Sequence, residues 1–116
     1  MEKLIYIIED DKDILTILNI FFKNKGYRVI ADYNGNRFKM PVEPCPNVYL
    51  VDVNLADKNG FDICKLIKKD CKHAQVVLMS ANINLEKMAM DCKADAFIHK
   101  PFNLENLFDL IDGVIA

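Results

Sequence analysis

Five short hydrophobic runs alternate along the chain with stretches in which apolar residues recur every three or four positions. The runs span residues 4–8, 28–31, 48–51, 76–79 and 96–98. The first run is continuously apolar, as expected of a strand that is buried on both faces of a sheet. Helical spacing is found in residues 13–25, 61–69, 85–92 and 104–115. This alternation predicts an α/β fold in which helices cover both faces of a parallel sheet.

The connection between the second and third runs departs from this pattern. It contains Gly35, Pro41, Pro44 and Pro46, and a proline inside a helix removes a hydrogen bond and clashes with the preceding turn. We therefore expect the second helix to be short or irregular, covering at most residues 36–40. A doubly wound sheet of five strands commonly has the flavodoxin-like order 2-1-3-4-5, and we adopt that order from known folds of this class.

Length and composition narrow the function classes. The 116 residues fit a single domain, residues 1–116. The 15 Lys and Arg residues against 17 Asp and Glu leave a net charge of −2, which does not favour direct nucleic-acid binding. No apolar run approaches the roughly 18–20 residues that would insert into a membrane, and the chain does not begin like a signal peptide. The four cysteines include no Cys-x-x-Cys pair, so we expect reduced thiols and a cytoplasmic protein.

Polar side chains stand where four of the predicted strands end. Glu9 and Asp10 follow the first strand, Asp52 the third, Ser80 the fourth and Lys100 the fifth. Each residue alone could be a helix cap, a turn residue or a solvated side chain. Independent caps would not all gather at one edge of the central strands, however, and ligands of open parallel sheets bind beyond that edge.

The chemistry of this set points to phosphoryl transfer. Three carboxylates repel one another, and a hard divalent cation with oxygen ligands, Mg²⁺, would offset that repulsion. A carboxylate beside a metal ion and an ammonium group is a candidate phosphoryl acceptor, which makes Asp52 the candidate nucleophile. Lys100 would neutralise the phosphoryl oxygens, and the Ser80 hydroxyl would donate a hydrogen bond to one of them.

These residues resemble those of the receiver domain of two-component response regulators, over essentially the whole chain. The matching motifs are Glu9-Asp10, Asp52, Asn59-Gly60, Ser80-Ala81 and Lys100-Pro101-Phe102. The resemblance implies that Asp52 is phosphorylated and that the Asn54 carbonyl joins Glu9, Asp10 and Asp52 as a metal ligand. It also implies switch roles for Ser80 and Phe97 and a cis peptide bond before Pro101.

The resemblance also implies partners. A sensor histidine kinase or a histidine phosphotransfer protein would supply the phosphoryl group, and we would then expect a signalling switch rather than a conventional enzyme. The face formed by residues 85–92, 96–98 and 104–115 would then change shape and control a partner, an output domain or a second copy of the chain. Leu110 and Val114 widen the apolar stripe of the last helix beside this face. The sequence fits a stand-alone receiver and a part of a hybrid kinase or larger regulator equally.

Three alternatives belong to other classes. A flavodoxin-type electron carrier would need a phosphate-binding loop after the first strand, where Glu9, Asp10 and Asp11 would repel phosphate. A hydrolase that forms an aspartyl-phosphate would typically have a second acid two residues after the nucleophile, where this chain has Asn54. A pseudo-receiver that only binds partners would usually have lost one of the site residues.

Overall fold

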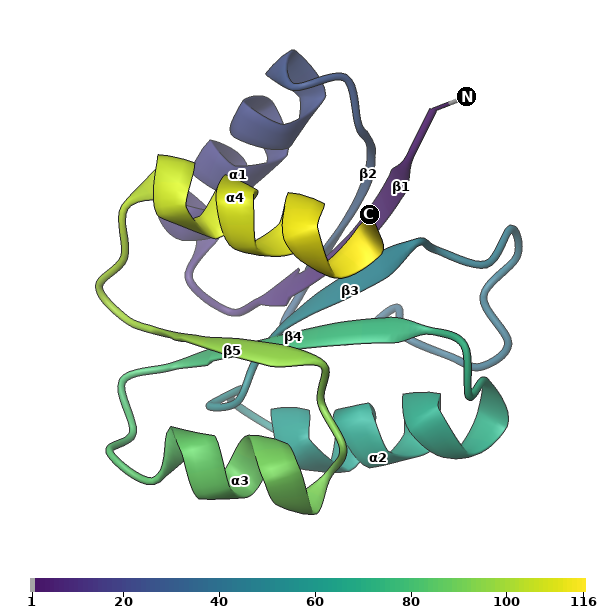
Figure 1. The fold of residues 1–116 in the computed structure, drawn as a ribbon, viewed down its shortest axis with the longest axis vertical. Helices are drawn as coiled ribbons and strands as arrows, with labels where there is room; N and C mark the ends of the chain where they lie inside the picture. The colour runs from purple at the N-terminus through teal and green to yellow at the C-terminus, as the bar shows by residue number, and fades with distance from the viewer. Residues whose placement is uncertain (1) are drawn as a thin grey trace.

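The computed structural model describes residues 2–116, which form a five-stranded sheet and four helices. All neighbouring strands are parallel and their order is β2-β1-β3-β4-β5, so the predicted order is confirmed. The elements in chain order are β1 (Leu4–Glu9), α1 (Lys12–Asn24), β2 (Arg28–Tyr33), β3 (Val48–Asp52), α2 (Gly60–Asp70), β4 (Gln75–Ser80), α3 (Leu85–Asp91), β5 (Ala96–His99) and α4 (Leu104–Ile115). Figure 1 shows α1 and α4 on one face of the sheet and α2 and α3 on the other.

Alternation along the strands divides the core between these two faces. Ile5 and Ile7 of β1 pack with the buried side chains of α1 and α4, whereas Tyr6 and Ile8 pack with those of α2 and α3. Every residue of β1 is buried, as its continuously apolar pattern predicts. The central strands therefore hold the charged residues at their ends in fixed positions.

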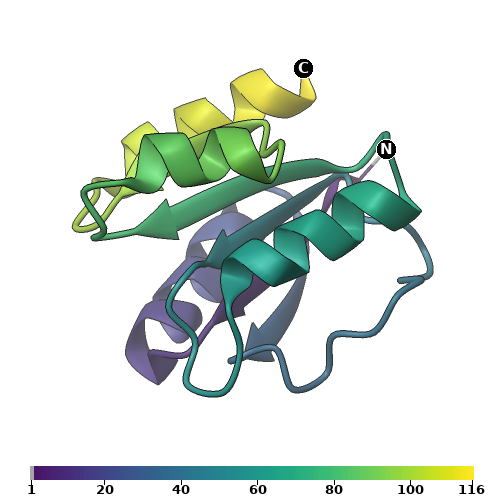
Figure 2. The ribbon, with the colours of Figure 1, turned by 90° about the horizontal axis from the view of Figure 1, so that it is seen from below.

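Residues 34–47, which we call the proline segment, form no helix and join β2 to β3 (Figure 2). This agrees with the expectation of an irregular second helix. Phe38, Met40 and Val42 are partly buried and pack against the α2 side of the core. Three apolar side chains thus cover the part of the sheet that a helix would otherwise cover.

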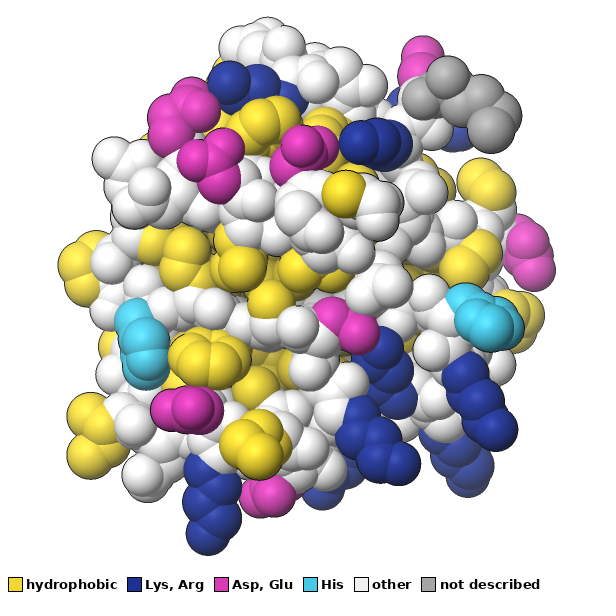
Figure 3. All heavy atoms as spheres, viewed as in Figure 1, with side chains coloured by type: hydrophobic (Ala, Val, Ile, Leu, Met, Phe, Trp, Pro, Cys, Tyr) yellow, Lys and Arg dark blue, Asp and Glu magenta, His cyan; other side chains and the backbone are white. Residues whose placement is uncertain are grey.

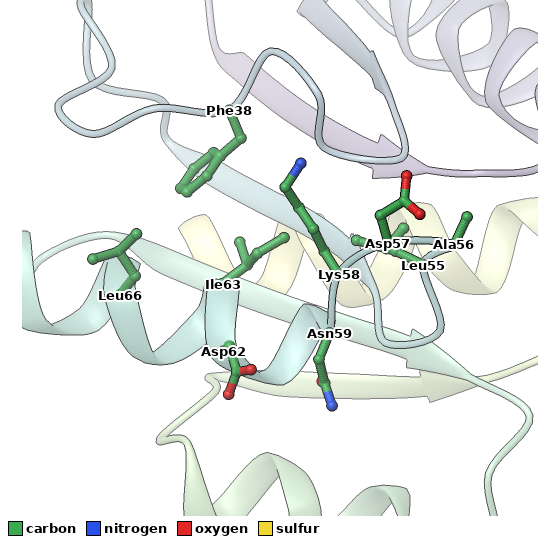
Figure 4. Close-up of a pocket in the computed structure, with 9 residues that line it drawn as sticks. All are labelled: Phe38, Leu55, Ala56, Asp57, Lys58, Asn59, Asp62, Ile63 and Leu66. Atoms are coloured by element: carbon green, nitrogen blue, oxygen red, sulfur yellow. The ribbon is translucent and has the colours of Figure 1, made fainter.

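An open hollow of about 670 Å³ lies between the proline segment and α2. Phe38 lines one side, Ile63 and Leu66 of α2 line another, and Lys58 reaches in from the loop after β3 (Figure 4). The hollow is lined by the loop that follows Asp52, and Asp52 itself is not among its lining residues.

The outer surface carries charge in separate regions. Lys and Arg side chains gather at the lower right of Figure 3, where α2 lies in Figure 1. Five lysines line a hollow of about 410 Å³ there: Lys65, Lys68, Lys69, Lys72 and Lys93. Lys68 donates to Asp95 at 2.6 Å.

Among residues 2–116, no helix has the length and apolar character needed to cross a membrane.

Candidate functional site

Four strand ends converge on one edge of the sheet, as the sequence predicts. They bring together Glu9, Asp10, Asp52, Ser80 and Lys100, which we call the acidic pocket. The side chains of Glu9 and Ser80 are fully buried and Asp52 is only 3% exposed. Such burial of charged residues is tolerated only where they are paired or bind a cation.

Lys100 links the two buried carboxylates. Its Nζ donates to Glu9 Oε1 at 2.6 Å and to Asp52 Oδ2 at 2.9 Å. The backbone of Lys100 is held in turn by a bond from its N–H to the Ser80 carbonyl at 3.0 Å. The peptide bond between Lys100 and Pro101 is cis. Burial alone would lower the pKa of Lys100, but the hydrogen bonds to Glu9 and Asp52 raise it overall, so the ammonium stays charged.

The three carboxyl groups outnumber this single cation. Oxygen atoms of Glu9, Asp10 and Asp52 all lie within 4.8 Å of one another. Burial, followed by the neighbouring Asp52, raises the pKa of Glu9, and Lys100 offsets part of that rise. Burial and Glu9 likewise raise the pKa of Asp10. Three carboxyl groups with only one ammonium group among them form a close set of oxygen ligands that fits a hard divalent cation such as Mg²⁺.

Asn54 and Asn82 fix the polar groups around Asp52. The backbone N–H of Asn54 donates to Asp52 Oδ1 at 3.2 Å. Ser80 Oγ accepts from the backbone N–H of Asn82 at 3.0 Å and from Asn54 Nδ2 at 3.4 Å. Because Ser80 accepts in both bonds, its hydroxyl keeps its own proton to donate. The sequence reasoning missed the roles of Asn82 and of the Asn54 side chain, although a hydroxyl that bonds two residues ahead is a known turn signal.

A glycine lets α2 begin directly against the backbone of Asp52. A Cβ atom at Gly60 would overlap the Asp52 carbonyl oxygen. The Gly60 N–H donates to the Val53 carbonyl at 2.9 Å, and Asn59 Oδ1 caps the helix by accepting from the Phe61 N–H at 2.9 Å. The Asn59-Gly60 pair therefore fixes the distance between α2 and β3.

Phe97 and His99 of β5 pack against one another, away from the charged groups of the acidic pocket. Phe97 is opposite Leu78 in the β4–β5 pairing, and its partly buried ring packs against the α2 and α3 side of the core. It meets the exposed His99 ring edge to face, with 5.8 Å between centroids. In this arrangement Phe97 packs against the core, and its switch role stays a prediction.

Known proteins share this fold. The chain matches the family described as "Response regulator receiver domain" over residues 5–112. A BeF3-activated receiver domain of DrrB has a TM-score of 0.89 and 27% identity, covering 99% of this chain and 98% of that one. The chemotaxis response regulator CheY4 of Vibrio cholerae has a TM-score of 0.87 and 20% identity, covering 98% of this chain and 99% of that one.

A third structure was solved with a metal ion. The response regulator TrrA from Thermotoga maritima, in complex with Mg²⁺ and BeF, has a TM-score of 0.84 and 20% identity. The match covers 97% of this chain and 98% of that one. These likenesses agree with the family match in fold, and the family match spans nearly the whole chain. The chain therefore belongs to the response regulator receiver domain family of two-component systems, whose members are phosphoacceptors rather than conventional enzymes.

Proposed function

We propose that this receiver is a phosphorylation-dependent switch in which Asp52 accepts a phosphoryl group from a phosphohistidine. The observation that carries the proposal is the pair of hydrogen bonds that Lys100 donates to Glu9 and Asp52, beside a third carboxyl group, that of Asp10. A nearly buried carboxylate that is held by an ammonium group and surrounded by oxygen ligands is prepared for phosphoryl transfer. A sensor histidine kinase or a histidine phosphotransfer protein is the donor.

The residues of this chain carry out the transfer step. An oxygen of Asp52 attacks phosphorus and forms a P–O bond. The P–N bond of the donor breaks, and its electron pair stays on the imidazole nitrogen, which takes up a proton. Lys100 already donates to Asp52 Oδ2, so its ammonium group is placed to donate to the phosphoryl oxygens. The Ser80 hydroxyl donates its own proton in a hydrogen bond to one of them.

Glu9, Asp10, Asp52 and the Asn54 carbonyl are the residues that would hold Mg²⁺. Three of these four supply the oxygen atoms that cluster within 4.8 Å. When bound, the ion neutralises the charge that develops on the phosphoryl oxygens. The Mg²⁺ and BeF in the TrrA structure support the choice of metal.

The phosphoryl group acts at a distance through α3, β5 and α4. Engagement of Ser80 pulls the loop from Ser80 to Asn84, which leads into α3, toward the phosphoryl group and vacates space near Phe97, because a phosphoryl oxygen offers an acceptor that was absent before. Leu110 and Val114 of α4 are only partly buried and give this face apolar area for a partner, an output domain or a second copy of the chain. We place the domain in the cytoplasm, where receivers typically work, as a stand-alone protein or a part of a longer one.

The central test is phosphorylation by acetyl phosphate, followed by intact mass. Wild type should gain one phosphoryl group in the presence of Mg²⁺ and none after chelation of the metal. Asp52→Asn should gain none, while Asp57→Asn, an exposed acid in the same loop, should be labelled like wild type. Labelling of Asp52→Asn would show that another residue is the acceptor and would overturn the proposal.

A second test addresses Ser80. Ser80→Ala should still be labelled at Asp52, because the nucleophile and Lys100 remain. With a phosphoryl mimic bound, amide shifts in α3, β5 and α4 should be smaller in Ser80→Ala than in wild type. Equal shifts in both proteins would mean that another group drives the change.

A further inference from the structure

Two cysteines lie in contact at the edge of the sheet opposite the acidic pocket. Cys45 of the proline segment and Cys71, the residue that ends α2, have their Sγ atoms 3.9 Å apart. Cys45 is exposed and Cys71 is partly exposed. Both line an open hollow of about 400 Å³ together with Tyr49 and Glu43. Small molecules in solution therefore reach both thiols.

The remaining gap is small and the segment that must move is weakly held. A disulfide needs its sulfurs about 2 Å apart, so they must approach by roughly a further 2 Å. Within the described residues, no backbone amide between Phe38 and Asn47 donates a hydrogen bond. Cys45 can therefore approach Cys71 without breaking the sheet or unwinding α2.

We propose that Cys45 and Cys71 form a reversible disulfide site for low-molecular-weight disulfides of the glutathione class. The Cys45 thiolate attacks one sulfur of the small disulfide, forms a mixed disulfide and releases one thiolate. The Cys71 thiolate then attacks Cys45 Sγ and releases the second. The protein loses two hydrogens, the small disulfide is reduced to two thiols, and the two protons end on those thiols.

The other two cysteines provide an internal comparison. Cys64 and Cys92 are buried, and their Sγ atoms donate to the backbone carbonyls of Cys92 and Ala89 respectively. Burial and the neighbouring Cys92 raise the pKa of Cys64 beyond the range in which thiols react at neutral pH. The folded chain thus holds one reachable thiol pair and one protected pair.

Burial and neighbouring groups both raise the pKa of the Cys45 thiol. Burial, then the neighbouring Cys71 and the charge of Glu43, raises the pKa of Cys45, which lowers its thiolate fraction at neutral pH. Tyr49 and Asp70 line the same hollow. Burial and the two cysteines raise the pKa of Tyr49, so its hydroxyl is neutral. A disulfide formed at this exposed site would be accessible to reducing thiols, so the link should be reversible.

The test is oxidation of the folded protein with oxidised glutathione, followed by a tryptic digest without reduction. Trypsin separates the four cysteines onto peptides 40–58, 59–65, 70–72 and 88–93. We expect peptides 40–58 and 70–72 to be joined, two of the four thiols to be lost, and a reducing agent to restore them. A link to peptide 59–65 or 88–93, or a lasting glutathione adduct on Cys45 beside a free Cys71, would overturn the proposal.

Two variants sharpen the result. Cys71→Ser should trap the mixed disulfide on Cys45, because the resolving thiol is gone. Cys92→Ala should leave the link between Cys45 and Cys71 intact, since neither thiol contacts Cys92. Oxidised wild type should also unfold at a higher urea concentration than reduced wild type, because the bridge shortens the unfolded chain between residues 45 and 71. An unchanged midpoint alongside an unlinked digest would reject the site.

Discussion

The acidic pocket, at the ends of regular strands, and the irregular proline segment are held in opposite ways. The two buried carboxylates of the pocket lie at strand ends and share a partner from a third strand end, because Lys100 donates to both Glu9 and Asp52. The proline segment is held at its start by buried Asp32, which accepts from the Arg37 N–H at 3.1 Å and from the Tyr6 hydroxyl at 2.7 Å. Between residues 39 and 46 it is held by apolar contacts, and at its end Asn47 donates to the Leu4 carbonyl at 2.9 Å and accepts from the Leu4 N–H at 2.8 Å. The residues proposed for phosphoryl transfer therefore lie at the well-supported strand ends, and the irregular backbone lies in the proline segment.

The largest effect should come from removing the cation of the acidic pocket. Lys100→Met keeps the length of the side chain but leaves buried Glu9 and nearly buried Asp52 without their ammonium partner. We expect a loss of about 3 kcal/mol in the free energy of unfolding, the usual size for breaking a buried ion pair. Urea unfolding monitored by circular dichroism measures it.

The same variant tests the metal site. Lys100 and Mg²⁺ neutralise the same carboxyl groups, so removal of Lys100 should tighten Mg²⁺ binding and Mg²⁺ should restore more stability to Lys100→Met than to wild type. Lys87→Met, which removes an exposed lysine from α3, is the matched control and should behave like wild type. If Lys100→Met were as stable as wild type without metal, the carboxylates would not depend on this ion pair.

The contrast between the two regions also explains what could be predicted from the sequence. Strand ends in a parallel sheet must meet at one edge, so Glu9, Asp52, Ser80 and Lys100 can be grouped from their places along the chain alone. Phosphoacceptor chemistry followed from the residue types, because few other sites need three acids and a lysine together. The prolines excluded a regular second helix for an equally local reason.

Contacts between residues far apart in the chain could not be predicted from the sequence in this way. The end of the second strand has no cluster of polar residues in the sequence, yet Asp32 there is fully buried and fixes the start of the proline segment. Its partner Tyr6 is 26 residues away in the chain, and nothing local indicates the pairing. Contact between Cys45 and Cys71 depends on the same segment, whose path follows from packing and not from a repeating pattern.

An intermediate effect should come from the glycine behind Asp52. Gly60→Ala places a methyl group onto the Asp52 carbonyl, which neither backbone can avoid without shifting, so we expect a loss of about 2 kcal/mol. Gly113→Ala is the matched control, since a Cβ there meets no atom within 4 Å and a helical alanine should add roughly 0.5–1 kcal/mol. Thermal unfolding of both variants separates them. Equal changes in the two would show that α2 can move away from β3 at no cost.

The smallest effect should come from the anchor of the proline segment. Asp32→Asn keeps the shape and one acceptor oxygen, which can still receive the Arg37 N–H. The Tyr6 hydroxyl then faces an amide instead of a carboxylate, so we expect a loss of only about 1 kcal/mol, that of one hydrogen bond. Tyr6→Phe removes the same bond from the other side, and the double variant should cost less than the sum of the two single changes.

The loss of stability in Asp32→Asn should be confined to the proline segment. An amide oxygen accepts the Arg37 N–H less strongly than a carboxylate oxygen does. Because the proline segment has few other bonds, Asp32→Asn should speed amide exchange at Arg37 and Phe38 while leaving exchange in β3 and β4 unchanged. Phosphorylation of Asp52 should proceed as in wild type, since the acidic pocket takes its support from other strands. If exchange rose equally throughout the sheet, or if Asp52 were labelled more slowly, the two regions would be coupled. The proline segment would then be a working part of the site instead of a separate cover over its sheet.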